Sequence, residues 1–151
     1  MIDNFVKWGL DRDLYNNSTR EKQVLKYLEE KGELARAVGK NDKSLVMDAI
    51  GDMIVCLTHV AYYDEELDVL GAFLKSKATT KADNFSCVYR IDEYTIDIFN
   101  GWWDDFQPIF THMNTISKSF GLTIGDCMEF AWNEIKDRKG KFVNGLFVKE
   151  K

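Results

Sequence analysis

Carboxylate side chains recur at helical spacing in two segments of the chain. Glu30 and Glu33 stand three residues apart, and Asp48 and Asp52 stand four residues apart. Both spacings place the paired side chains on one face of an α-helix. Carboxylate oxygens are ligands that magnesium prefers, and bound ions can clamp a phosphate chain and generate a hydroxide nucleophile. The pattern therefore indicates metal-assisted chemistry on phosphates.

Crowding of these acids favours a bound cation. If a helical hairpin brings the carboxylates to ~6 Å from one another, each pair repels by roughly 3 kcal/mol at an effective dielectric constant of about 20. A marginally stable domain cannot easily absorb the sum, and a divalent ion relieves it at neutral pH. Gly51 disfavours the helix around it and indicates close approach by another backbone or a ligand. The alternative is a solvated acidic helix face.

Capping signals predict the helices that carry these acids. Ser18 and Glu21 match a capping box, which predicts a helix over residues 19–38 that ends before Gly39. A second helix is predicted over residues 43–62, where apolar side chains recur at helical spacing. Because only a short turn separates the two helices, we expect them to form an antiparallel hairpin.

The first of these helices places its polar side chains on a narrow arc. At ~100° per residue, Gln23, Lys26, Glu30 and Glu33 fall within roughly 80° of one another, beside the apolar arc. The carboxylates are therefore expected to border the core. On the following helix, His59 extends the stripe of the aspartates, and the spacing assigns it no role.

Similar signals predict the other elements. Helices are expected over about residues 2–13, 67–74, 102–120 and 123–136, with a polar, mobile loop over 75–83 and a β-hairpin over 142–148. Thr123 with Asp126 begins the last helix, and Asn144-Gly145 is a two-residue turn in a hairpin suited to a small lid or an oligomer contact. We therefore expect one all-α domain, residues 1–151, built as an antiparallel bundle of about five helices with a short C-terminal β-hairpin.

Composition excludes several classes of function. A net charge of -5 argues against binding to a nucleic-acid polymer, which requires clustered Lys and Arg. The 3 cysteines lack the paired spacing of zinc and redox sites, which favours reduced thiols in the cytoplasm. The N-terminus has no basic region followed by an apolar stretch, and polar side chains interrupt the longest apolar run, residues 53–60. We therefore expect neither secretion nor a membrane span.

Two blocks of sequence carry a family resemblance. The acidic segments read Gln23-x-x-Lys26-x-x-x-Glu30-x-x-Glu33 and Asp48-Ala49-Ile50-Gly51-Asp52, and a later block runs from Ala131 to Lys141. Together they resemble the MazG-like all-α nucleoside triphosphate pyrophosphohydrolases, in particular the small phage-encoded members. The later block looks like the last core helix of that family, in which Asn, Lys and Arg reach the substrate phosphates. The resemblance covers about half of the chain and leaves residues 64–110 as an extended insertion.

The resemblance implies an activity and a set of site residues. The reaction would be attack of water on the α-phosphorus of a nucleoside triphosphate, with release of pyrophosphate. Magnesium, or manganese in its place, would be held by Glu30, Glu33, Asp48 and Asp52. The implied catalytic residues are Glu29, Glu30 and Glu33, and the implied substrate-binding residues are Gln23, Lys26, Asn133, Lys136, Arg138 and Trp8. The family also implies a homodimer or homotetramer, in the host cytoplasm if the protein is phage-encoded.

One departure from the family pattern leaves other functions open. The second acidic motif of the family is Glu-x-x-Asp, and the Glu position is Ala49 in this chain, so Asp48 is the proposed substitute and Glu29 a reserve ligand or base. Lys136 and Arg138 also suit the negative end of a helix dipole without any substrate. The alternatives are a dUTPase-like or phosphoribosyl-ATP-pyrophosphatase-like activity, and an inactive helical bundle that binds a nucleotide or a protein.

Overall fold

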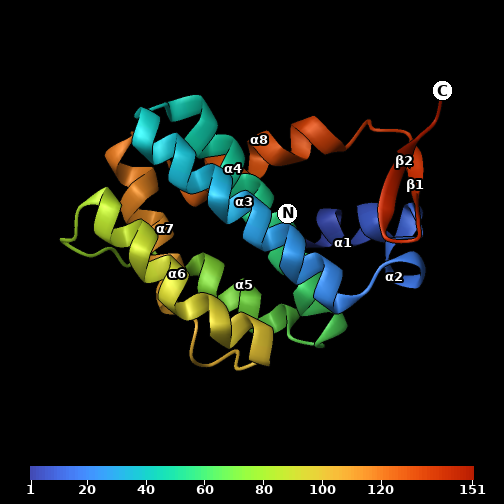
Figure 1. Ribbon diagram of the computed structural model, residues 1–151, viewed down its shortest axis with the longest axis horizontal. Helices are drawn as coiled ribbons and strands as arrows, with labels where there is room; N and C mark the ends of the chain where they lie inside the picture. The colour runs from blue at the N-terminus through green and yellow to red at the C-terminus, as the bar shows by residue number, and fades with distance from the viewer.

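Eight helices and a two-stranded hairpin make up most of the chain, and the structure, a computed structural model, describes all residues from 1 to 151 (Figure 1). The elements are α1 (Ile2–Asp11), α2 (Leu14–Asn17), α3 (Arg20–Lys40), α4 (Lys43–Tyr63), α5 (Leu67–Lys75), α6 (Asn84–Asn100), α7 (Pro108–Ser119), α8 (Ile124–Ile135), β1 (Gly140–Val143) and β2 (Leu146–Lys149). The predicted helical bundle with a C-terminal hairpin is therefore confirmed, although it has more helices than the five expected.

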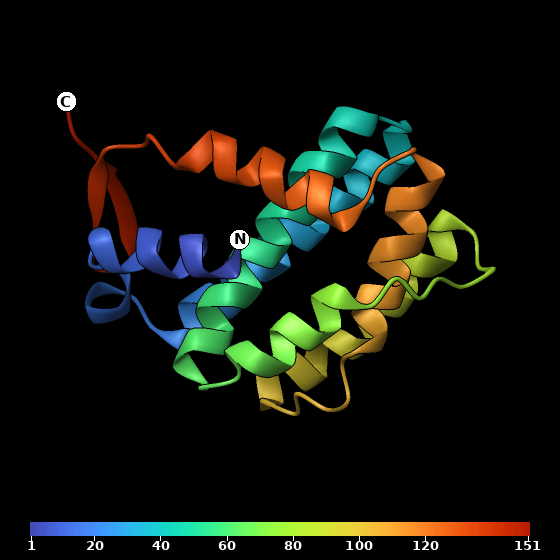
Figure 2. The same cartoon turned by 180° about the vertical axis from the view of Figure 1, so that it is seen from behind.

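The predicted antiparallel pair, α3 and α4, crosses the middle of the molecule (Figures 1 and 2). The Thr19 hydroxyl accepts a hydrogen bond from the backbone N–H of Lys22 at the start of α3, and the Asp42 carboxylate accepts one from Leu45 at the start of α4. These bonds satisfy N–H groups that a helix leaves unpaired in its first turn. Asn41 lies between the helices with a left-handed backbone, φ 51°, which ends α3.

Helix α4 forms the centre of the core and packs closely against α8. A side chain at Gly51 would place its Cβ only 2.4 Å from the carbonyl oxygen of Cys127 on α8, so the glycine permits the contact between backbones that its position in a helix indicated. By length and composition α4 is apolar enough to cross a membrane, but 67% of that stretch is buried inside the protein. Such burial is typical of a core helix.

Helices α5, α6 and α7 form a layer on one side of the α3–α4 pair, and α8 lies on another (Figure 2). The loop expected over residues 75–83 lies in this layer and makes defined contacts. Its Ser76 and Ala78 carbonyls accept hydrogen bonds from the side chain of Asn114, and its Thr80 N–H donates to Thr115 Oγ1.

The predicted hairpin turn is confirmed at Asn144 and Gly145. Both residues have positive φ angles, 52° and 82°, as a two-residue turn between twisted strands requires. The hairpin lies beside α1 and α2, and the N–H of Phe142 donates to the carbonyl of Arg12 at 2.8 Å. The C-terminal strands are therefore attached to the N-terminal helices.

Several predicted boundaries near the N-terminus are wrong. The helix expected over residues 2–13 ends at Asp11, because Asp13 has a left-handed backbone, φ 57°, and α2 follows as a separate turn. Ser18 does not cap α3, because the next residue, Thr19, is the N-cap, and the Ser18 hydroxyl accepts from the side chain of Gln23 instead. The same helix runs past Gly39 to Lys40, because the left-handed residue that stops it comes after the glycine.

A whole helix, α6, lies where none was predicted. It begins after Asp83, whose side chain accepts from the N–H of Ser86, and ends at Gly101 with φ 73°. The helix expected over residues 102–120 starts only at Pro108, which occupies its first turn as α7. Residues between α6 and α7 form turns, because proline suits a helix start but not a helix interior.

Candidate active site: a cleft between the α3–α4 pair and the C-terminal hairpin

A cleft of about 630 Å³ opens between the α3–α4 pair, the end of α8 and the β-hairpin. It combines charged side chains from α3, α4 and the end of α8 with aromatic side chains from α1 and the hairpin. Its charged lining residues include Lys26, Glu29, Glu30, Asp52 and Arg138, and its aromatic lining residues are Trp8, His59, Phe142 and Phe147. The cleft therefore offers one surface for anionic or metal ligands and another for a planar apolar group.

Glu30 and Lys26 form the charged wall on α3. The Glu30 residue is only 8% exposed, although it carries a carboxylate. The ammonium group of Lys26 lies 2.9 Å from Glu30 Oε1 and 3.1 Å from Glu29 Oε2. These bonds raise the pKa of Lys26, although burial alone would lower it. Lys26 therefore supplies the positive charge that pairs with the carboxylates of Glu29 and Glu30.

Asp52 faces this wall from α4 without a hydrogen-bond partner. Burial raises the pKa of its carboxyl group to about 7, with further contributions from the carboxylates of Glu30 and Asp48. Arg138 and Lys26 offset only part of this effect. The cluster of carboxylates around Asp52 therefore has too little positive charge nearby to keep Asp52 fully ionised. With a pKa of about 7, about half of the Asp52 side chains would be protonated near neutral pH.

Helix α8 and the segment after it add charges that face Asp48. Burial raises the pKa of Asp48, and the carboxylates of Glu134 and Glu33 raise it further, while Arg138 lowers it. Glu134 was not among the predicted site residues, and its place in the block from Ala131 to Lys141 was the available signal. The second acidic motif therefore meets the last helix as well as α3.

The carboxylates have suitable chemistry for a hard divalent ion, but they do not form a ready ligand group. No three His, Cys, Asp or Glu side chains are grouped as metal ligands. Glu33 instead lies 3.5 Å from Arg36 with its side chain 53% exposed, and Ala49, at the position expected to carry a glutamate ligand, is buried. A divalent metal ion would fit the oxygen ligands and would supply the positive charge that the carboxylates lack. The carboxylate side chains would have to rotate to coordinate the ion together.

Trp8 forms the aromatic end of the cleft together with the hairpin. Its ring lies 5.7 Å from the ring of Phe147 and 6.0 Å from that of Phe142, between centroids. The indole Nε1 donates to the carbonyl of Ile135 at 2.8 Å, so this polar atom is already paired. Trp8 is 7% exposed and thus belongs to the core, with a small surface available in the cleft.

Other predicted substrate residues lie in different settings. Gln23 lines the cleft, and its amide donates to Ser18 at 3.0 Å. Lys136 and Asn133 are exposed and bond each other at 2.8 Å, and neither lines the cleft. Of the three predicted substrate residues in the later block, Arg138 is the one that lines the cleft.

The hairpin, which was predicted as a small lid or an oligomer contact, lines one side of the cleft. Lys22 on α3 donates from Nζ to the carbonyl of Asn144 at 3.1 Å, which joins the hairpin turn to the acidic helix. Arg12 joins α1 to the segment between α8 and the hairpin, because its guanidinium donates hydrogen bonds to the carbonyls of Lys136 and Arg138. These contacts join segments more than a hundred residues apart, so no local spacing could predict them.

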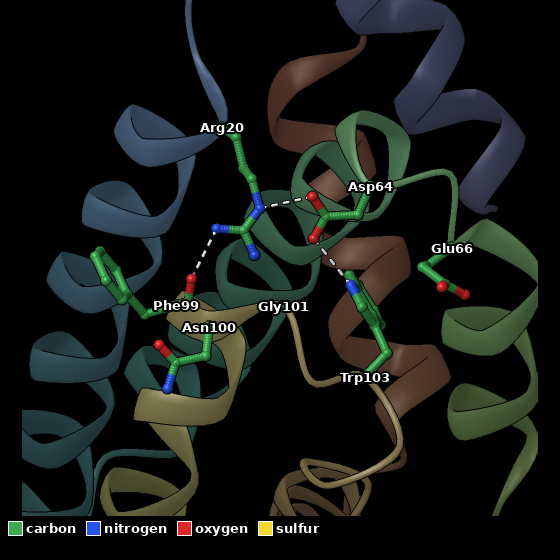
Figure 3. Close-up of a pocket in the computed structure, with 7 residues that line it drawn as sticks. All are labelled: Arg20, Asp64, Glu66, Phe99, Asn100, Gly101 and Trp103. Carbon is green, nitrogen blue, oxygen red and sulfur yellow. Dashed lines mark hydrogen bonds and ion pairs between the residues drawn. The ribbon is translucent and has the colours of Figure 1, made fainter.

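A second cleft, of about 330 Å³, lies on the far side of the α3–α4 pair, and two of its charged residues, Arg20 and Asp64, form an ion pair (Figure 3). Arg20 Nε donates to Asp64 Oδ1 at 2.6 Å, and Trp103 Nε1 donates to Asp64 Oδ2 at 2.9 Å. The same guanidinium donates to the carbonyls of Ile98 and Phe99 at the end of α6. This arrangement, the Arg20–Asp64 junction, joins three helices and uses both carboxylate oxygens of Asp64.

Comparison with known proteins links the chain to a phage protein. No protein-family model matches the chain, and no solved structure matches it. A stretch of 61 residues is 41% identical to part of a protein of Haemophilus phage HP1 (strain HP1c1), described as an "uncharacterized 18.2 kDa protein in rep-hol intergenic region". The match covers 40% of this chain and 37% of the phage protein, so the chain is aligned with just over a third of its relative's length.

Proposed function

We propose that the protein is a magnesium-dependent nucleoside triphosphate pyrophosphohydrolase that releases a nucleoside monophosphate and pyrophosphate. The observation that carries the proposal is the division of the cleft. The charged lining residues Glu30, Asp52, Lys26 and Arg138 interact with one another, and the aromatic lining residues Trp8, Phe142 and Phe147 pack together as a separate group. A nucleotide has the same division, with an anionic phosphate chain at one end and a planar base at the other.

Glu30 and Asp52, with Asp48 and Glu33 nearby, are the residues that would hold magnesium, or manganese in its place. The bound ion would neutralise phosphate charge and lower the pKa of a bound water. The raised pKa of Asp52 supports this role, because a carboxyl group that lacks a cationic partner gains most from a divalent ion.

The chain's own cations would act on the phosphates. Lys26 and Arg138 both line the cleft and both act on Asp52, so both can neutralise charge on the triphosphate and on the departing pyrophosphate. Glu29 bonds Lys26 and has a side chain 65% exposed, which allows it to accept the proton from the attacking water. Positioning and charge stabilisation of this kind supply most of the rate enhancement in phosphate displacement.

The direct test is release of pyrophosphate from a panel of nucleoside triphosphates, with and without magnesium. Glu30→Gln keeps the size of the side chain and removes its charge, so we expect a loss of kcat of about 100-fold or more. Glu33→Gln is expected to lower turnover similarly, and activity within about threefold of wild type would remove Glu33 from the ligand set. Glu129→Gln, an exposed change on α8, is the matched control.

The panel also separates the related activities. Strong preference for dUTP would indicate a dUTPase-like enzyme, and turnover of phosphoribosyl-ATP alone would indicate the other alternative. Absence of magnesium-dependent pyrophosphate release from every nucleotide would contradict the proposed function.

A second candidate is a catalytically inactive protein that binds a nucleotide. It is favoured by Ala49 at the position of a family ligand and by the lack of three grouped metal ligands. Binding of a triphosphate analogue by calorimetry, combined with no pyrophosphate release at any magnesium concentration, would support this candidate.

We also propose a homodimer or homotetramer. Helix α6 exposes Phe85, Tyr89, Ile96 and Phe99, each more than half accessible and spaced so that they share one helix face. Exposed apolar faces of this kind are typical of protein contacts. Size-exclusion chromatography with light scattering should give two or four times the 17.5 kDa chain mass, and a monomer at micromolar concentration would contradict it.

A further inference from the structure

One histidine in the cleft wall has a buried ring nitrogen with no partner. His59, on α4, is 2% exposed and lines the cleft two helical turns beyond Asp52. Its Nδ1 lies 2.8 Å from the hydroxyl of Tyr15, whereas its Nε2 forms no hydrogen bond. Buried polar atoms in proteins are nearly always paired, because an unpaired one costs free energy. The unpaired nitrogen is therefore a place where a bound ligand can make a bond that the protein lacks.

The surroundings of His59 determine which nitrogen carries the proton. Burial lowers the pKa of His59 to about 3, so the ring is neutral and has one N–H group. Burial, with help from Tyr62, raises the pKa of Tyr15, so the phenol keeps its proton. If the phenol donates to Nδ1, only the Nε2–H group is unpaired. The reverse direction would leave both the phenol proton and the Nε2 lone pair unpaired, so Nε2 is the donor.

The Tyr15–His59 pair is held in place by close packing. A Cβ at Gly9 would lie 3.0 Å from Tyr15 Cε2 and 3.1 Å from His59 Cε1, so the glycine on α1 leaves the space that the pair occupies. The Tyr15 ring also stacks on Tyr62 with a centroid distance of 3.8 Å. Restriction of both rings fixes the direction in which the free N–H group points.

The chemistry around Nε2 suits the ring of a base rather than a phosphate or a metal. Trp8 lies beside His59, with centroids 6.2 Å apart, and its own N–H is bonded to Ile135, so it presents apolar surface. Phe147 extends this surface from the hairpin. A neutral N–H donor on an apolar wall favours a neutral acceptor attached to a planar ring.

We propose that Nε2–H of His59 recognises the substrate by donating a hydrogen bond to a carbonyl oxygen of its base. This inference rests on the proposed function. Because Nε2 of His59 has almost no exposed surface, the acceptor atom on the base must project beyond the ring of the base. A carbonyl oxygen does so, whereas a ring nitrogen does not. A small shift of neighbouring side chains would admit the oxygen. Uracil, thymine, cytosine and guanine carry such an oxygen, whereas adenine carries none.

The test measures kcat and KM for dUTP, dTTP, dCTP, dGTP and dATP with magnesium. Wild type should have a KM for dATP about tenfold above those of the carbonyl-bearing nucleotides. His59→Phe, which keeps a planar ring and removes both nitrogens, should raise KM about tenfold for carbonyl-bearing bases and leave dATP and every kcat within about threefold. His59→Gln offers an amide N–H near the position of Nε2 and should restore part of the preference.

Tyr15→Phe provides a second test that leaves the histidine in place. Without the phenol the ring proton can move to Nδ1, so the preference over dATP should fall by about threefold or more. This variant decides the matter if His59→Phe fails to fold, as judged by its thermal melting. An equal rise in KM for dATP and the other nucleotides would show a purely structural role, and unchanged preference in both variants would also overturn the inference. Absence of turnover with every nucleotide would instead remove the proposed function and this inference with it.

Discussion

Two aspartates, Asp52 within α4 and Asp64 at its end, lie on opposite sides of the α3–α4 pair, and only Asp64 is hydrogen-bonded. In the Arg20–Asp64 junction each carboxylate oxygen of Asp64 receives a hydrogen bond, and Arg20 also bonds two backbone carbonyls (Figure 3). In the first cleft, which is lined by Glu30, Asp52 and Arg138 and is called the acidic cleft, Asp52 has no hydrogen-bond partner. Burial together with neighbouring carboxylates raises the pKa of Asp52 to about 7. The same helix pair therefore carries one carboxylate that is fully hydrogen-bonded, Asp64, and one that has no hydrogen-bond partner, Asp52.

The difference separates a structural role from a functional one. A buried charge that is fully paired can stabilise a junction, but it has no bonding capacity left for a ligand. An unpaired carboxylate destabilises the isolated protein and becomes favourable when a cation arrives. Changes at the junction should therefore affect stability, and changes in the cleft should affect activity.

The largest expected effect is on turnover, from Asp52→Asn. The substitution removes a proposed metal ligand while preserving the shape of the side chain, so kcat/KM should fall about 100-fold or more. The free energy of unfolding without metal should stay equal or rise, because a repelling buried carboxylate is lost. Steady-state kinetics and urea denaturation measure the two quantities. Near-wild-type turnover, or a large loss of stability, would show that Asp52 has a structural role like that of Asp64.

The second effect is on stability, from Asp64→Ala at the Arg20–Asp64 junction. The change leaves the guanidinium of Arg20 and the indole N–H of Trp103 without their carboxylate, so the free energy of unfolding should fall by about 2–3 kcal/mol. Denaturation by urea measures this loss, and kcat/KM of the folded protein should remain within about twofold. A selective loss of activity with unchanged stability would assign a function to the second cleft.

A smaller effect is the pH dependence of stability in the absence of divalent ions. The folded pKa of Asp52, about 7, lies above the value of about 3.9 expected in the unfolded chain, so the folded state binds more protons between them. Stability from this group is complete below about pH 4 and is lost as pH rises through 7, by about 2 kcal/mol. Denaturation midpoints in EDTA should fall less steeply for Asp52→Asn than for wild type. If the stability of wild type and of Asp52→Asn changed with pH in the same way, Asp52 would not be the group that titrates.

Much of the fold followed from local signals in the sequence. The Thr123 and Asp126 box is present, because each side chain needs only the backbone of the same turn. The Asn144-Gly145 turn is present for the same reason. Helix α6 was missed because a row of its large apolar side chains faces outward, so its pattern did not indicate an inward face, although Asp83 and Gly101 mark its ends.

The candidate site was only partly predictable. The spacing of Glu30 and Asp52 identified the acidic walls, since α3 and α4 are neighbours in sequence. Trp8, His59 and the hairpin meet through contacts between distant segments, such as the bond from Trp8 Nε1 to Ile135. The unpaired Nε2 of His59 has no sequence signal, because it depends on the position of Tyr15 in three dimensions.

The acidic cleft is proposed to hold a divalent ion together with a triphosphate. Isothermal titration calorimetry of magnesium into the protein with a non-hydrolysable triphosphate analogue tests it most directly, with Asp52→Asn and Asp64→Asn as the paired variants. The cleft should take up magnesium in wild type and in Asp64→Asn, with affinity reduced about tenfold or more in Asp52→Asn. No magnesium uptake by wild type, or equal affinity in all three proteins, would contradict the claim.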